Sequence, residues 1–305
     1  MDTAHLQAFV KVAETGSFSM AARQLFITQP AVSKRINQLE QQLGSQLLNR
    51  SGKRILLTQT GRLLLTRARQ ILNEIQSVRQ QIADMEGSPM GSLSLATSHH
   101  IGLHRLPPIL RAYTARYADV ELDLSFMDSE QACLLVEKNE LEMAVVTLPF
   151  SESPKLSFTP VWHDELKLVC ATGHPLARQP VNRLQDLLPH AAVLPSHGTY
   201  TREAIEQALQ PILHEIKITL ETNYLETIKM MVSVGLGWSA LPQSMLDESL
   251  QVIEIDSFSS SRELGIVVNR QRSASRAAQA MIDLINRNAA ETTGNNSSRP
   301  AWTTS

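Results

Sequence analysis

The stretch "SFSMAARQLFITQPAVSKRINQLEQQLG", residues 17–44, contains two short helical patterns on either side of a tight break. Ser17 is placed to cap the first helix, and Thr28 is placed to cap the second. Pro30 falls in the first turn of the second helix, where a missing N–H costs little. Its apolar residues recur at steps of four, three and four, which predicts one buried face: Val32, Ile36, Leu39 and Leu43. Gly44 then ends the helix.

The opposite face of the second helix is polar, and it consists of Gln29, Pro30, Ser33, Lys34 and Asn37. Amides and hydroxyls at such spacing can donate to and accept from base edges, and Lys34 can neutralise a phosphate. The helix start at Thr28 offers free N–H groups to a phosphate. Two helices joined by a short turn match the helix-turn-helix that enters the major groove. An ordinary solvated helix of a small bundle has a similar face, so this pattern alone favours neither interpretation.

The next stretch, "QLLNRSGKRILLTQTG" (residues 46–61), predicts a β-hairpin wing. It places Arg50, Lys53 and Arg54 around a glycine, between two short apolar runs. A hairpin with a basic tip suits phosphates or an adjacent minor groove. Thr58 then caps a long helix. The hairpin favours the DNA-binding interpretation over the plain bundle.

Residues 1–61 resemble the winged helix-turn-helix of the LysR-type transcriptional regulators. The resemblance lies in "FVKVAETGSFSMAARQLFITQPAVSKRINQLEQQLGSQLLNR" and in "LTQTG", where the glycine, the alanine pair, Gln-Pro, Ser-Lys, Leu-Glu and Leu-Gly have the family's spacing. The chain departs from the family at Leu48, where Phe is usual, and at Thr60, where Ala is usual. We expect neither position to touch DNA. The resemblance implies a sequence-specific transcriptional regulator whose activity a small-molecule effector modulates.

The distribution of charge agrees with a DNA-binding head. Residues 1–70 hold ten Lys and Arg against three Asp and Glu, a net charge of +7, and the remainder carries −9. A basic head on an acidic body indicates that only the head meets a polyanion, here double-stranded DNA.

A heptad pattern follows in the connecting helix. Its apolar positions alternate at steps of four and three: Leu64, Ala68, Ile71, Ile75, Val78, Ile82 and Met85. A 3.5-residue repeat is typical of a helix that pairs with another helix. The simplest partner is the same helix of a second subunit, giving a homodimer. The resemblance implies that dimers pair further into homotetramers, with RNA polymerase as a further candidate partner.

After residue 91, short apolar runs such as "SLSLAT" and "MAVVTL" alternate with helical segments, which predicts mostly parallel sheets covered by helices. The resemblance implies an α/β effector domain of two Rossmann-like lobes, like a periplasmic binding protein. The expected domains are a winged helix-turn-helix (1–61, the motif itself at about 18–37), a dimerisation helix (62–88), an effector domain (89–288) and a disordered tail (289–305). The lobes are expected at about 91–162 plus 267–288, and at 163–266, with the chain crossing near 162–166 and 262–268.

Effector contacts are expected where strands end and helices begin, because ligands of open α/β sheets bind there. The residues concerned are Ser98, His99, His100, Thr147, His197, Thr199, Tyr200, Thr201, Arg202 and Tyr224, with Asn223 and Glu226 beside the last. The resemblance implies that the hydroxyl residues among them contact the effector. Donors are many and acids few, so we expect a small anion. If a histidine supplies charge, binding should tighten as pH falls through ~6.5.

Metal, cofactor and catalytic sites are not expected. The His99–His100 pair lacks acids or thiols at ligand spacing, and Ser98 and His99 would face opposite ways on a strand. No G-x-S-x-G elbow occurs. Cys133 and Cys170 lie in apolar runs and are expected to be buried small hydrophobes. The alternative to a regulator is a solute-binding or enzymatic α/β protein with an incidental helical domain, and binding of a DNA duplex would decide between them.

The N-terminal segment has an acid at position 2 and no long apolar core, which predicts no signal peptide. Nowhere do 18 apolar residues run together, which predicts no membrane span. We therefore expect a cytoplasmic protein.

Overall fold

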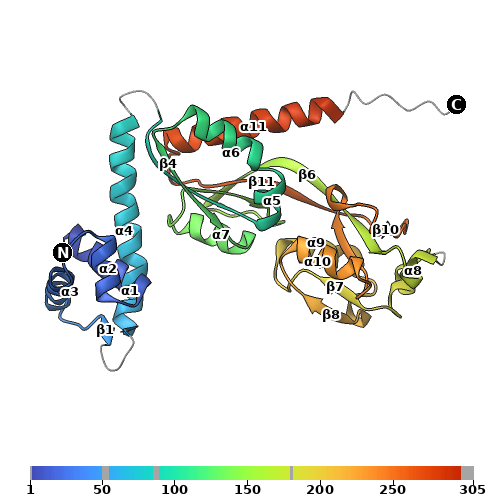
Figure 1. The fold of residues 1–305 in the computed structure, drawn as a ribbon, viewed down its shortest axis with the longest axis horizontal. Coiled ribbons are helices and arrows are strands. Elements are labelled where there is room, and N and C mark those ends of the chain that lie inside the picture. The colour runs from blue at the N-terminus through green and yellow to red at the C-terminus, as the bar shows by residue number, and fades with distance from the viewer. Residues whose placement is uncertain (1, 50–54, 85–88, 179–180, 297–305) are drawn as a thin grey trace. The chain divides into compact units, whose positions relative to one another are not determined.

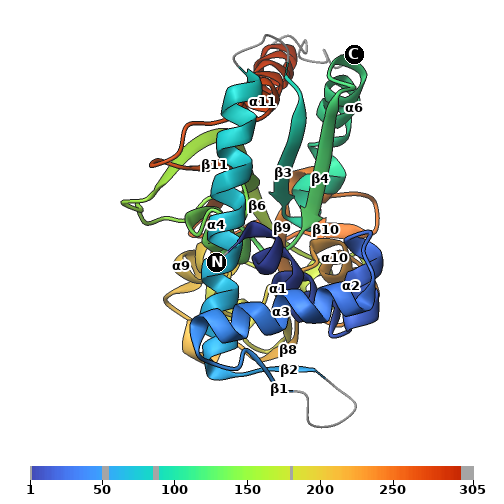
Figure 2. The ribbon, with the colours of Figure 1, turned by 90° about the vertical axis from the view of Figure 1, so that its left-hand side faces the viewer.

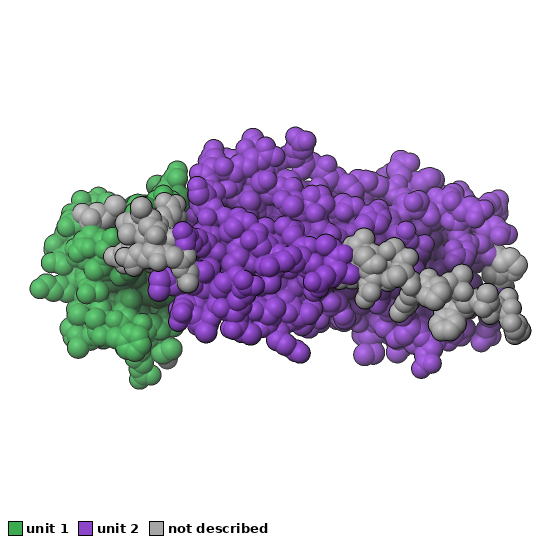
Figure 3. Space-filling model, turned by 90° about the horizontal axis from the view of Figure 1, so that it is seen from above, with its two compact units in different colours: residues 1–86, 138–140 green, residues 87–137, 141–305 purple. Residues whose placement is uncertain are grey.

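The computed structural model describes residues 2–49, 55–84, 89–178 and 181–296. The chain forms two compact units, one of residues 1–86 with 138–140 and one of residues 87–137 with 141–305, which Figure 3 colours separately. Each unit has its own hydrophobic core.

The first unit is a winged helix. Its elements are α1 (Thr3–Thr15), α2 (Phe18–Gln24), α3 (Gln29–Leu43), β1 (Leu48–Asn49), β2 (Leu56–Leu57) and α4 (Gln59–Asp84). Figure 2 shows α1, α2 and α3 gathered beside the first half of α4. The predicted caps are confirmed at Ser17, whose side chain accepts from the Met20 N–H, and at Gly44, which ends α3 with a φ of 62°. Thr28 precedes α3 as expected, but its side chain makes no capping hydrogen bond.

The predicted wing is present as an antiparallel pair, with Leu48 opposite Leu57. The Glu40 carboxylate ties α3 to it by accepting from the Leu47 N–H at 2.8 Å. Thr58 caps α4 as predicted, since its hydroxyl accepts from the Gly61 N–H at 2.9 Å. A Cβ at Gly61 would lie 2.1 Å from the Leu47 carbonyl oxygen, so only glycine fits where α4 leaves the wing. The basic tip residues Arg50, Lys53 and Arg54 lie outside the described residues.

The heptad positions of α4 divide into two groups. Ala68 is fully buried and Leu64 packs against the core of the winged helix, so this end of the stripe is used within the chain. Further along, Ile71 is 37% exposed and Val78 is 46% exposed. The predicted seam with a second copy is therefore available from Ile71 onward, and the side chains of its last two positions lie outside the described residues.

The second unit is α/β. In the order of the chain, its elements are β3 (Gly91–Thr97), α5 (His99–His104), α6 (Pro107–Arg116), β4 (Val120–Phe126), α7 (Ser129–Glu137), β5 (Met143–Thr147), β6 (Leu156–Ala171), α8 (Pro175–Arg178), η1 (Leu184–Leu187), β7 (Ala192–Leu194), α9 (Tyr200–Leu209), η2 (Leu213–Glu215), β8 (Ile218–Glu221), α10 (Leu225–Ser233), β9 (Ser239–Pro242), η3 (Gln243–Met245), β10 (Leu250–Val252), β11 (Ser260–Asn269) and α11 (Arg276–Asn296). The predicted alternation of strands and helices is confirmed.

The main sheet has the order β10-β6-β11-β5-β3-β4, with β9 also paired to β6. β3 is parallel to β4 and β5, but β11 is antiparallel to both β5 and β6. The expectation of mostly parallel sheets is therefore wrong for the main sheet. The reason is visible in Figure 1: β6 carries the chain from the first lobe to the second, and β11 brings it back in the opposite direction.

The second unit consists of two lobes, and each lobe has its own hydrophobic core. In the first lobe, α6 and α11 cover one face of the sheet and α7 covers the other (Figure 1). Its core includes Leu93, Tyr113 and Met281, whereas the second lobe packs around Ile205 and Trp238. The two lobes are joined through β6 and β11, the segments where the sequence predicted the crossings.

Helix α11 runs to Asn296, so the prediction of a disordered tail from residue 289 is wrong at its start. Ala289 is still in the core of the first lobe, because the small apolar residues of α11 keep one face on the sheet through that turn. Among the described residues, none of the helices has the length and apolar character needed to cross a membrane.

Candidate DNA-reading surface and effector pocket

The exposed face of α3 forms a shallow groove, which we call the DNA-reading surface. Its lining is Gln29, Pro30, Ser33, Lys34, Asn37, Gln38 and Gln41. It contains every predicted DNA-contact residue of α3 and no acid. The side chains of Gln29, Ser33 and Lys34 make no hydrogen bond or ion pair with any other residue that the structure describes. Their donors and acceptors are therefore available to an external partner.

Phe26, in the turn before α3, was missed by the sequence analysis. Its side chain is 95% exposed and its φ is 54°, in the left-handed region. That conformation costs a residue with a Cβ roughly 1–2 kcal/mol. The exposed ring lies in the turn between α2 and α3, three residues before Gln29, and it is not among the residues that line the DNA-reading surface. The only sequence signal was an aromatic residue inside a predicted turn.

In the second unit, a cavity of about 150 Å³ lies between the two lobes, and we call it the effector pocket. Seven of the ten predicted effector residues line it: Ser98, His99, His100, Thr147, Thr199, Thr201 and Tyr224. The lining also includes Phe126, Met127, Asp128, Ser129, Glu130, Pro195, Asn223, Leu225 and Arg262. The structure thus brings together segments that lie more than 160 residues apart in the sequence.

Three predicted residues do not line the pocket: His197, Tyr200 and Arg202. His197 is exposed on the loop before α9, and the Tyr200 ring packs against the core near Cys133. Arg202 was also predicted to contact the effector, but its side chain points away from the pocket. Its guanidinium turns into the second lobe and donates to Glu206, to Glu221 and to the Pro195 carbonyl oxygen at 2.7–3.0 Å.

Arg262 on β11 is the arginine that reaches the pocket. Its Nε and Nη2 both donate to the Asp164 carboxylate on β6, at 2.9 and 2.7 Å, and Nη1 donates to the Thr201 hydroxyl at 2.8 Å. The side chains of Arg262 and Asp164 are each 4% exposed. Burial lowers the pKa of Arg262, and the adjacent Asp164 opposes that shift. This buried ion pair fastens α9 to the two strands that join the lobes.

Two carboxylates that were not among the predicted residues also line the pocket. Asp128 accepts from the Asn223 amide at 2.8 Å, and Glu130 accepts from the backbone N–H of Tyr200 at the start of α9. Burial raises the pKa of Glu130. In both cases an acid of the first lobe binds a donor of the second. Asp128 directly precedes α7 and Glu130 lies in its first turn, and neither position indicated its partner in advance.

The side chains of His99 and His100 lie in different surroundings, because the two residues begin helix α5 rather than continue a strand. His99 packs edge-on against Phe126 and Tyr224, with ring centroids 5.9 and 5.1 Å away. His100 turns with His104 toward Glu226. Burial lowers the pKa of His100, so this histidine would gain a proton only at a pH below the ~6.5 of a free imidazole.

Each of the two units matches a known protein family. Residues 3–62 match the family described as "Bacterial regulatory helix-turn-helix protein, lysR family", and residues 86–290 match "LysR substrate binding domain". The chain belongs to the LysR family. It is a DNA-binding transcriptional regulator with an effector-binding domain and not an enzyme.

Relatives of this LysR-family chain include a "Probable RuBisCO transcriptional regulator" of Trichormus variabilis, 30% identical over 285 residues that cover 90% of the chain and 85% of the relative. An uncharacterised regulator of Azotobacter vinelandii is 56% identical over 108 residues, 35% of the chain and 75% of the relative. Among solved structures, full-length OxyR of Pseudomonas aeruginosa has a TM-score of 0.70 at 21% identity, covering 93% of the chain and 94% of that structure. CbnR complexed with its target DNA has a TM-score of 0.67 at 20% identity, covering 94% and 100%. Both structures share the fold.

The two thiols of this LysR-family chain are buried, as predicted. Burial raises the pKa of Cys133 and of Cys170 to about 11. Little thiolate is present at neutral pH, and thiolate is the reactive form. Neither cysteine has the environment of a redox sensor.

Proposed function

We propose that this LysR-family regulator reads a specific duplex with α3 and that a small molecule in the effector pocket modulates the binding. The observation that supports this most is the contrast in bonding: the side chains of Gln29, Ser33 and Lys34 have no described partner, and they form one exposed groove. In the major groove, such amides and hydroxyls bind base edges. Asn37 extends the same face, and the start of α3 at Thr28 offers N–H groups to a phosphate. Arg50, Lys53 and Arg54 are proposed to bind phosphates from the wing.

The effector is proposed to be a small anion that also carries hydroxyl or amine donors. The carboxylate of Glu130 already accepts from the start of α9, so this helix start is occupied and a bound anion must take its hydrogen bonds from other donors of the pocket. The hydroxyl of Ser98 makes no side-chain capping bond and faces the same cavity. Asp128 and Glu130 add acceptors, which a simple anion such as sulfate would leave unused.

Dimerisation is proposed to use the exposed part of the α4 stripe. Ile71 and Val78 are large apolar side chains left open to solvent at heptad spacing, with Ile75 between them. Two such stripes bury each other in a coiled coil. A dimer would carry two DNA-reading surfaces, which strengthens binding to a two-fold symmetric site. Pairing of dimers into tetramers remains a proposal from the family resemblance.

The effector proposal is tested by calorimetric titration of the full chain with a panel of hydroxy acids, amino acids, sulfate and polyamines. Ser98→Ala removes one pocket hydroxyl and should weaken the bound anion by roughly 0.5–1.5 kcal/mol, the net worth of one hydrogen bond. Ser92→Ala, on strand β3 that leads to Ser98 and outside the pocket, is the matched control. DNA affinity without the ligand should stay unchanged in both variants. Tightest binding of a polyamine, or equal affinity for wild type and Ser98→Ala, would contradict the proposal.

A further inference from the structure

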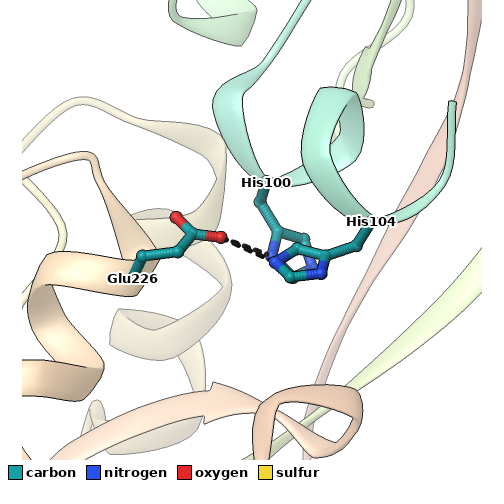
Figure 4. Close-up of side chains that lie close together, drawn as sticks. All are labelled: His100, His104 and Glu226. Carbon is teal, nitrogen blue, oxygen red and sulfur yellow. Dashed lines mark hydrogen bonds and ion pairs between the residues drawn. The ribbon is translucent and has the colours of Figure 1, made fainter. Parts of the chain in front are cut away.

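A cluster of three metal-ligating side chains lies where the two lobes meet, and Figure 4 shows them pointing toward one another. His100 and His104 come from α5 of the first lobe, four residues apart and therefore on one helical face. Glu226 comes from α10 of the second lobe. Its Oε1 lies 2.9 Å from Nε2 of His104 and 3.4 Å from Nδ1 of His100.

Two buried atoms of this cluster have no hydrogen-bond partner among the described residues: Nε2 of His100 and Oε2 of Glu226. The side chain of His100 is only 4% exposed, so water reaches it poorly. An unsatisfied buried polar atom costs about 1–3 kcal/mol. A ligand that satisfies these two atoms would therefore stabilise the folded chain.

We propose that His100, His104 and Glu226 form a binding site for a divalent transition-metal ion, with Zn²⁺ as the best match. Two imidazoles and one carboxylate are ligand types that zinc prefers, and two histidines at i, i+4 on one helix are a recurrent zinc-binding spacing. Bonds of ~2.0–2.1 Å place tetrahedral donors ~3.3 Å apart. One potential ligand atom from each of the three residues already lies within 4.8 Å of the others, so small side-chain movements complete the set.

The surrounding charges do not oppose this ion on balance. Arg262 and Arg105 lie nearby, but Asp164 accepts from the first and lies 3.9 Å from the second, and Glu226 is itself an anion. A carboxylate binds a metal ion in its ionised form, and Oε1 of Glu226 already faces a ring nitrogen of each histidine.

An ion in this site has a structural consequence, because its ligands come from both lobes. Binding would hold α5 against α10 and stabilise the arrangement in which the effector pocket is formed. Three protein ligands leave at least one coordination position open. His100 is part of the pocket lining, so the ion and a pocket ligand would be neighbours. The ion would then tune the response to the effector.

The test uses the full chain after removal of metal with a chelator. Zn²⁺ is titrated in competition with a chromophoric chelator, and Co²⁺ is added in parallel, because its visible absorption reports four-coordinate geometry. The wild-type chain should take up one equivalent. His104→Ala and Glu226→Gln should each weaken this by at least ~100-fold, because loss of a mere outer-shell partner costs 10–100-fold. His104 is about half exposed, so its removal should leave the fold intact.

The matched control is His190→Ala. His174 and His190 form another histidine pair, with ring centroids 4.9 Å apart, and no carboxylate completes a three-ligand group there among the described residues. This variant should bind one equivalent like the wild type. The proposal is overturned by the absence of stoichiometric binding, which would leave the three residues as a hydrogen-bonded contact, or by equal affinity in His104→Ala. DNA binding and effector binding measured in chelator report on the proposed function separately, since neither requires the ion.

Discussion

The DNA-reading surface and the effector pocket are both polar, but their side chains are used differently. On α3, Gln29, Ser33 and Lys34 make no described bond within the chain. In the pocket, Arg262 is bound to Asp164 and Thr201, and Glu130 accepts from the start of α9. The first surface is kept open for a partner, whereas the second is cross-linked by its own residues.

Residues of the DNA-reading surface therefore serve binding without contributing to stability, whereas residues of the effector pocket contribute to both. An exposed side chain without partners can be replaced with little effect on folding. A buried charge cannot be removed without leaving its partner uncompensated. Substitutions on the DNA-reading surface should therefore change DNA binding alone, whereas substitutions in the pocket should also change the stability of the second unit.

Arg262→Gln should destabilise the second unit by about 3–5 kcal/mol, because it leaves the Asp164 carboxylate buried without its cation. The measurement is unfolding in urea, followed by far-ultraviolet circular dichroism. Arg111→Gln, on the exposed face of α6, is the control and should change the free energy of unfolding by less than about 0.5 kcal/mol. A loss of under 1 kcal/mol for Arg262→Gln would show that the pair is accessible to water in solution.

Ile75→Lys should convert the dimer into monomers, because it puts a charge into the exposed part of the α4 stripe. Loss of the second DNA-reading surface should weaken binding to a two-fold symmetric duplex by at least ~10²-fold. Sedimentation velocity gives the mass, and fluorescence anisotropy gives the affinity. Leu63→Lys is the control, since Leu63 is exposed on α4 outside the heptad positions. An unchanged mass for Ile75→Lys would place the dimer interface elsewhere.

The DNA-reading surface could be predicted from the sequence because all its residues lie on one helix. Spacing within a helix is fixed, so a step of four in the sequence is a step along one face in space. The wing and the start of α4 followed from equally local signals. The order of elements in the second unit was predicted for the same reason, since each strand or helix shows its own periodicity.

The pocket could be predicted only in part because it is assembled from distant segments. Hydroxyls at strand ends were expected there, but Asp128, Glu130 and Arg262 were not, because what each meets lies 70 or more residues away or on the other lobe. The pairing of His100 with His104 depends on α5 being a helix, whereas the sequence suggested a strand end. The direction of β11 likewise depends on the return of the chain between the lobes, which no local pattern encodes.

The most direct test of the central claim compares Gln29→Ala with Gln42→Ala, the same substitution at an exposed α3 position outside the groove. Affinity is measured for a duplex obtained by in vitro selection with the full chain and for a random duplex of equal length. Gln29→Ala should cost ~1–3 kcal/mol on the selected duplex only, with the free energy of unfolding unchanged. Gln42→Ala should behave like the wild type on both. Equal weakening of the two duplexes by Gln29→Ala, or an equal effect of Gln42→Ala, would contradict the assignment of this face of α3 to base recognition.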